Sequence, residues 1–192
     1  METLYEIDHV FVCAAFGAPE AEQLIAFGLT EGSRNRHPGQ GTANRRFFFR
    51  NAMLELLWVE SAEEAQGDNV RRLGLWERWS QRATSACPFG ICYRPTSDAT
   101  LPPPFESWQY RPPYAPITIS VALTSTKFDE PLCFYIPYVR KAARDEPQAH
   151  TVSIGDLTST ASVGSTMELT FDGGKHELRT DFSPLLPLVI IR

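Results

Sequence analysis

The chain has 192 residues, 43% of them hydrophobic and 21% charged, which is enough apolar material to bury a core in one or two compact units. Its 23 acidic and 18 basic side chains give a net charge of −5, and no more than two basic residues are adjacent, so we expect no nucleic-acid partner. The N-terminal residues lack the basic and apolar runs of a secretory signal, and no apolar stretch approaches membrane-spanning length, so we expect a cytoplasmic protein that does not bind membranes.

The beginning of the chain predicts a strand followed by a short helix. Alternation of apolar and polar residues predicts a strand over Tyr5–Cys13, with His9 on the same face as Ile7 and Phe11. A proline suited to the first helical turn comes next, and apolar residues at helical spacing continue to Gly28, where a helix can end. We therefore expect a helix of about nine residues before Gly28.

The following segment predicts a hairpin. Glu31–Asn44 is polar and contains several glycines, which indicates a loop or a strand interrupted by loops. The aromatic segment Arg45–Arg50 and the apolar segment Met53–Val59 each predict a strand, and Asn51-Ala52 between them indicates a turn. We expect these two strands to pair.

A helix and then a series of strands are predicted for the remainder. Asp68–Arg82 has aromatic and aliphatic residues at helical spacing, despite Gly74, and is predicted to be a helix that connects two halves. Strands are predicted over Phe89–Arg94, Trp108–Arg111, Ile117–Thr124, Cys133–Ile136, Thr151–Leu157, Met167–Phe171 and Glu177–Thr180. The tight-turn sequence Asp172-Gly173-Gly174 predicts that Met167–Thr180 is a hairpin.

The four cysteines are Cys13, Cys87, Cys92 and Cys133, and no two of them form a C-x-x-C pair. Because no export signal is present, we expect all four thiols to stay reduced and no disulfide to form.

Two acidic residues occupy similar positions in apolar strands. Glu55 lies within Met53–Leu56, and Glu168 lies within Met167–Leu169. Because both halves are also rich in strands, this similarity leads us to expect two similar β-rich halves that share one cavity.

His9 and Glu55 are the strongest candidates for chemistry, because an imidazole and a carboxylate within apolar strands need a polar partner or a metal ion. In one interpretation they converge in the shared cavity. In the other, His9 forms a hydrogen bond within the core and Glu55 pairs with an arginine such as Arg46. The spacing of the residues does not decide between the two.

The polar loop between the first helix and the hairpin is a second candidate. Its donors are His37, Gln40, Asn44, Arg45 and Arg46. Amide and guanidinium groups together with accessible backbone N–H groups suit a carboxylate or another oxyanion. The alternative is a structural loop in which Arg46 pairs with Glu55 or Glu60. Trp58 would add an apolar wall if it faced the same ligand.

Three segments of the first half, Ile7–Val12, His37–Phe49 and Leu54–Val59, resemble the first module of glyoxalase-like proteins in the vicinal oxygen chelate superfamily. The resemblance implies an α+β fold in which two βαβββ-like modules form a curved, cup-shaped, mostly antiparallel sheet with helices on the outside. It implies a single domain over residues 1–192, with a first module at about 4–62, a connecting helix at about 68–82 and a strand-rich second module at about 87–192.

The resemblance also implies a site. Metal-binding members use a histidine from the first strand of a module and a glutamate from its last strand, which correspond to His9 and Glu55 in this chain. The second half departs from the pattern, because its opening strand has no histidine and Gly90 or Cys92 stands there instead. The remaining candidate ligands are Glu168, by its similarity to Glu55, and Cys92, as a thiolate. We therefore expect a divalent metal ion to be weakly bound or absent.

Three classes of function follow from these observations. The first is a metal-dependent lyase, isomerase or dioxygenase, with Glu55 as the catalytic residue and a metal held by His9, Glu55 and Glu168. The second is a metal-free small-molecule binding or sequestering protein of the bleomycin-resistance type, with a ligand bound by His37, Gln40, Asn44, Arg46 and Trp58. The third is an interaction module that forms a homodimer through its tryptophan-bearing helix and proline-rich strands.

Overall fold

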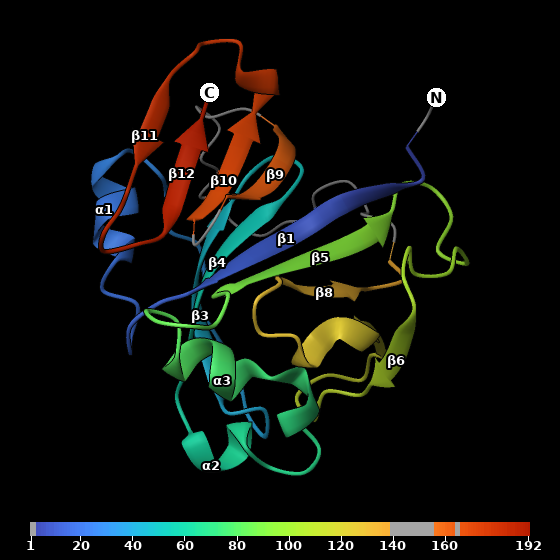
Figure 1. Ribbon diagram of the computed structural model, residues 1–192. Coiled ribbons are helices and arrows are strands. Elements are labelled where there is room, and N and C mark those ends of the chain that lie inside the picture. Colours follow the sequence, from blue (N-terminus) through green and yellow to red (C-terminus); the bar gives the residue numbers. More distant parts are fainter. Residues whose placement is uncertain (1–2, 139–155, 164–165) are drawn as a thin grey trace.

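The computed structural model describes residues 3–138, 156–163 and 166–192 (Figure 1). The first module consists of β1 (Tyr5–Cys13), α1 (Ala21–Ala26), β2 (Asn35–His37), β3 (Thr42–Phe48) and β4 (Met53–Val59). In this module β1 is parallel to β4, whereas β3 is antiparallel to both β4 and β2. The predicted hairpin of β3 and β4 is therefore confirmed, and the module has the expected βαβββ order.

The second module repeats this strand arrangement without the helix. It consists of β5 (Phe89–Pro95), β6 (Ser107–Tyr110), β7 (Ile119–Ala122) and β8 (Leu132–Tyr135). Here β5 is parallel to β8, and β7 is antiparallel to both β8 and β6. The connection from β5 to β6 contains Pro102–Pro104, and prolines lack the N–H that a helix requires and disfavour helical backbone before them.

Antiparallel pairing of β1 with β5 joins the two modules into one eight-stranded sheet of order β2-β3-β4-β1-β5-β8-β7-β6. The first strands of the two modules are thus central, and β2 and β6 are the two edges. A mixed α+β fold built on a curved, open sheet of two related modules agrees with the expectation from the resemblance.

The segment that connects the modules is not the single helix predicted over Asp68–Arg82. It contains α2 (Ala62–Ala65), the 3-10 helix η1 (Arg71–Leu73) and α3 (Leu75–Ser80). Gly74 separates η1 from α3 because its backbone is left-handed, with φ of 68°, and a Cβ atom there would lie 2.5 Å from the Phe128 ring. Within the described part of the chain, no helix has the length and apolar character needed to cross a membrane.

The C-terminal strands form a separate sheet, which the sequence did not predict. Its elements are β9 (Leu157–Val163), β10 (Thr166–Phe171), β11 (Arg179–Asp181) and β12 (Leu188–Ile191), in the order β11-β12-β10-β9. The hairpin predicted over Met167–Thr180 is wrong, because β12 lies between β10 and β11 and is parallel to β10. Most of the strand predicted over Thr151–Leu157 lies outside the described residues.

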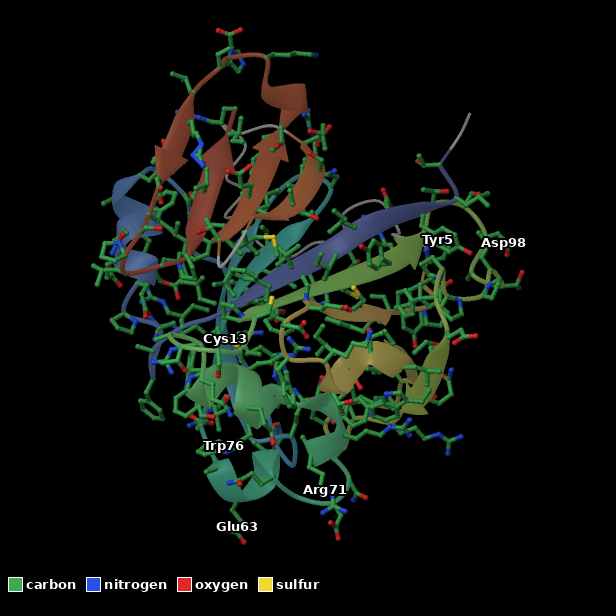
Figure 2. The ribbon with its side chains drawn as sticks, in the orientation of Figure 1. Tyr5, Cys13, Glu63, Arg71, Trp76 and Asp98 are labelled. Atoms are coloured by element: carbon green, nitrogen blue, oxygen red, sulfur yellow. The ribbon has the colours of Figure 1, made fainter. Side chains whose placement is uncertain are left out.

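Apolar side chains cover both faces of the eight-stranded sheet. On one face Val10, Val12 and Leu54 pack with residues of α1 and of the four-stranded sheet, which lie together in Figure 1. On the other face Phe11 and Leu57 pack with η1, α3 and the strands of the second module. Figure 2 shows Glu63 and Arg71 extending outward from α2 and η1, at the end of the molecule away from the four-stranded sheet.

Candidate functional site

A bulge in β1 determines how His9 is held. The pairing of β1 with β5 shifts between Ile7 and His9, so Asp8 is an extra residue in the ladder. Ile7 packs with Val10 and Val12 on the face away from Phe11. The predicted sharing of one face by Ile7, His9 and Phe11 is therefore wrong for Ile7, because the bulge reverses the alternation at this point.

The bulge brings the Asp8 carboxylate against the His9 imidazole. The distance between His9 Nδ1 and Asp8 Oδ2 is 2.7 Å, and Asp8 Oδ1 accepts a hydrogen bond of 2.5 Å from Arg94. Arg94 is buried and also donates to Glu6, which fixes the carboxylate. Burial alone would lower the pKa of His9, but its interactions with Cys92, with Glu55 and with Asp8 together raise that pKa well above the ordinary value.

Glu55 is a buried carboxylate on β4. Glu55 is only 8% exposed, and no described residue donates a hydrogen bond to its carboxylate. Its negative charge acts on His9, His37 and Tyr114, since it contributes to the pKa of each. The pairing with Arg46 is not formed, although the two residues face each other across β3 and β4, because Arg46 donates to the Ser33 carbonyl at 2.6 Å.

His9 and Glu55 line the same cavity, which has a volume of about 230 Å³ and lies between the sheet and the connecting segment. Most of its wall is apolar and consists of Phe11, Leu57, Leu73, Leu75, Ile117, Ile119, Val121, Leu132, Phe134 and Ile136. The polar groups are His9, Asn35, His37, Gln40, Glu55, Tyr110 and Tyr114. An apolar wall with a few polar groups is typical of small-molecule sites.

His37 and Gln40 are the two residues of the predicted binding loop that reach the cavity. His37 Nδ1 lies 2.8 Å from Thr42 Oγ1, and Gln40 Nε2 donates to the same hydroxyl at 2.8 Å. Burial lowers the pKa of His37, which favours its neutral form. The Tyr110 hydroxyl donates to Gln40 Oε1 at 3.0 Å, so this loop of the first module is bonded to the second module.

The structure places the other predicted binding residues away from the cavity wall. Asn44 is fully buried and accepts a hydrogen bond from the Asn35 backbone N–H. Arg45 is ion-paired with Glu22 and Glu31. Trp58 follows Leu57 in the strand and therefore lies on the opposite face, where it packs in the other apolar cluster. Arg45 and Arg46 are therefore engaged by Glu22, Glu31 and Ser33, and neither is available to bind an oxyanion in the cavity.

Glu168 lies in β10 of the four-stranded sheet, where it accepts a hydrogen bond of 2.6 Å from Arg179. It is not part of the cavity wall, so the structure does not bring it together with His9 and Glu55. The similarity of sequence around Glu55 and Glu168 did not indicate spatial equivalence, because the C-terminal strands form a sheet of their own.

Sequence reasoning missed Asp8, Tyr110 and Tyr114. A bulge leaves no mark in the apolar pattern, so the side-chain position of Asp8 was not predictable from it. Tyr110 and Tyr114 flank a proline-containing loop of the second module, and their approach to the first module depends on how the whole sheet curves. The structure records all four cysteines as free thiols.

A curved sheet of two related four-stranded modules around a shared cavity defines the class of glyoxalase-like folds. A family model described as a glyoxalase-like domain matches residues 7–109, which is more than half of the chain. The chain belongs to this family, in agreement with the resemblance to the vicinal oxygen chelate superfamily.

Solved structures with a similar fold are distant in sequence. A hypothetical protein from Bacillus halodurans C-125 is 11% identical, with 74% of this chain and 99% of that chain covered and a TM-score of 0.44. A variant of Streptomyces coelicolor methylmalonyl-CoA epimerase in complex with 2-nitronate-propionyl-CoA is 12% identical, with 70% and 97% covered and a TM-score of 0.43. No curated protein matches the chain by sequence.

Proposed function

We propose that this protein binds a small, mostly apolar organic molecule in the cavity, with Glu55 accepting a hydrogen bond from the ligand or, in a reaction, a proton. The observation that carries the proposal is the Glu55 carboxylate itself, which is buried, faces the cavity and receives no hydrogen bond from any described residue. A carboxylate that faces an apolar cavity and accepts no hydrogen bond from a described residue is free to accept one from a ligand, which favours a role in binding or catalysis.

The shape of the wall supports a compact ligand. Aliphatic and aromatic side chains from both modules and from the connecting segment surround a volume of about 230 Å³, which suits one ring or a short branched chain. Because the polar groups lie on a minority of the wall, the ligand would place its polar group near Glu55 and His9 and its apolar part against the second module.

A metal-assisted function is the second candidate, favoured by one cluster. The ligand atoms of Asp8, His9 and Cys92 lie within 4.8 Å of one another. However, both carboxylate oxygens of Asp8 already accept bonds from Arg94 and His9. Cys92 is fully buried, and burial raises the pKa of its thiol, which favours the protonated form.

In the second module, β8 and the residue that follows it present Leu132, Phe134 and Ile136 to the cavity, so they add no donor to this cluster. Gly90 also leaves no room for a ligating side chain, because a Cβ atom there would lie 2.0 Å from the Phe11 ring. On the cavity wall, the described histidines and carboxylates are His9, His37 and Glu55. Both ring nitrogens of His37 already contact Thr42 and Asn35, and the remaining pair, His9 and Glu55, is a poor fit to a complete coordination shell. We derive no chemical step through a metal.

The metal content of the protein tests this choice. We expect protein purified without a histidine tag to carry less than one equivalent of divalent metal after dialysis, as measured by inductively coupled plasma mass spectrometry. A stoichiometric ion that is retained by the wild type and lost in Glu55→Gln would instead establish the metal-assisted function.

Binding by Glu55 is tested with pairs of single-ring compounds. Phenols, benzyl alcohols and benzamides each have an N–H or O–H donor, and each is compared with an analogue that has a methyl group in its place. We expect calorimetry to show tighter binding of the donor compounds. In Glu55→Gln this preference should fall about tenfold, because a neutral acceptor forms a weaker hydrogen bond than a carboxylate.

Glu168→Gln is the matched control, since it removes a carboxylate from the four-stranded sheet and should leave binding unchanged. If no compound binds to the wild type, or if Glu55→Gln binds both members of every pair as the wild type does, the proposed function is wrong.

A further inference from the structure

We infer that Tyr114, in the loop between β6 and β7, determines which ligands fit the cavity by closing it over Glu55. This inference rests on the proposed function and concerns the size of the ligand and one of its hydrogen bonds. The match to the family model ends at residue 109, before Tyr114. Its position follows from three contacts between the modules.

The first contact is a stack of rings. The centroids of His37 and Tyr114 lie 4.5 Å apart with an angle of 35° between the ring planes. Both side chains line the cavity together with Glu55. His37 is held at its two ring nitrogens by Thr42 and Asn35, so the imidazole is a fixed surface against which the Tyr114 ring rests.

The second and third contacts hold the same two loops together. Tyr110 donates its hydrogen bond of 3.0 Å to Gln40. Gly39 lies against Pro113, since a Cβ atom on Gly39 would be 2.7 Å from Pro113 Cγ. We call the three pairs, His37–Tyr114, Gln40–Tyr110 and Gly39–Pro113, the clasp.

The clasp connects parts of the sheet that are farthest apart in strand order. Gln40 and Gly39 lie in the turn between the edge strand β2 and its neighbour β3, whereas Tyr110 ends the opposite edge strand β6. The clasp therefore closes the cup across its two edges, and a ligand that extends past Tyr114 must separate them.

Tyr114 also supplies a hydroxyl to this end of the cavity. Burial raises the pKa of Tyr114, and interactions with Tyr110 and Glu55 act in the same direction. No described residue accepts a hydrogen bond from this hydroxyl. Because Tyr114 and Glu55 line the same cavity, we expect a ligand oxygen that donates to Glu55 to accept a hydrogen bond from Tyr114.

The test compares phenol with 4-benzyloxyphenol, which has the same donor ring and a second ring beyond it. We expect the wild type to bind phenol and to bind 4-benzyloxyphenol at least about tenfold more weakly, because the clasp blocks the second ring. Tyr114→Ala should remove this difference. Tyr114→Phe keeps the ring, so it should keep the difference and weaken phenol binding about 2- to 12-fold through loss of one hydrogen bond.

Gly39→Ala opens the clasp from the other side without changing a residue of the cavity wall, because the new methyl group would displace Pro113. It should admit 4-benzyloxyphenol as Tyr114→Ala does. Tyr138→Ala is the matched control, since this tyrosine is 47% exposed and does not line the cavity.

Admission of the larger compound by both clasp variants, with Tyr138→Ala unchanged, supports the inference. The inference is overturned if the wild type binds the two compounds equally, or if both clasp variants still bind 4-benzyloxyphenol more weakly than phenol by the wild-type factor. In either case the proposed binding function stands. Binding of neither compound by any variant overturns the inference, and the benzyl alcohols and benzamides then decide whether the proposed function stands.

Discussion

Replacing Arg78 with alanine should lower the free energy of unfolding by about 3 to 4 kcal/mol. Arg78 is fully buried in α3 and donates to four backbone carbonyls, those of Cys87, Ser125, Lys127 and Glu130. These carbonyls precede β5 and β8 or belong to the segment between β7 and β8. One guanidinium group therefore fixes the connecting segment to the second module.

The loss is large because the alanine variant would leave several buried carbonyls without a donor, and each such group costs about 1 to 3 kcal/mol unless water reaches it. Burial lowers the pKa of Arg78, because a charged guanidinium is disfavoured away from water. The hydrogen bonds to the four carbonyls offset this cost. Urea unfolding followed by circular dichroism measures the effect.

Arg71→Ala is the matched control for this measurement. Arg71 is ion-paired with Asp68 at 3.3 Å, and the two side chains are 68% and 88% exposed, so its removal should change stability by less than about 0.5 kcal/mol. A loss below about 1 kcal/mol in Arg78→Ala would mean that water or other groups replace the guanidinium.

Replacing Gly90 with alanine should cost about 2 to 3 kcal/mol and should also reduce ligand binding. Gly90 lies in β5 directly opposite Phe11 in β1, and a Cβ atom on it would lie 2.0 Å from the Phe11 ring. Since Phe11 is 3% exposed and lines the cavity, the ring has no free space to enter except the cavity itself. The substitution would therefore strain the core and fill part of the binding space.

A double-mutant cycle separates this clash from any intrinsic effect of alanine in the strand. Phe11→Leu should be destabilising in the wild type but should offset part of the cost in Gly90→Ala, because the smaller side chain leaves room for the methyl group. Chemical unfolding of the four proteins gives the coupling free energy. Additive effects would show that the two residues do not interfere.

Local pattern alone predicted the elements that contain the candidate pair. The strand over Tyr5–Cys13 and the strand over Met53–Val59 have the predicted bounds, because alternating or continuous apolar residues of high strand preference define them locally. The structure then places His9 and Glu55 in one cavity, as expected if the two strands are neighbours. Their roles in binding or catalysis stay predictions.

Interactions between distant segments decided the rest. The bulge at Asp8 depends on pairing between β1 and β5, which are far apart in the chain. Asp8 and its partner Arg94, for example, are separated by 86 residues. Gly74 interrupts the predicted helix because its backbone is left-handed, and its contact with Phe128 leaves no room for a Cβ atom.

Two further features have the same origin. The Met167–Thr180 hairpin does not form, since β12 from the end of the chain gives β10 a parallel partner and enters the space where β11 was expected. Tyr114 reaches His37 because the open eight-stranded sheet curves until the loops beside its two edge strands come into contact. The sequence by itself thus determined the strands and the two residues most suited to chemistry, because periodicity and residue type act locally. The partners, the clasp and the shape of the cavity were decided by the tertiary structure, because long-range pairing and packing leave no periodic signal along the chain.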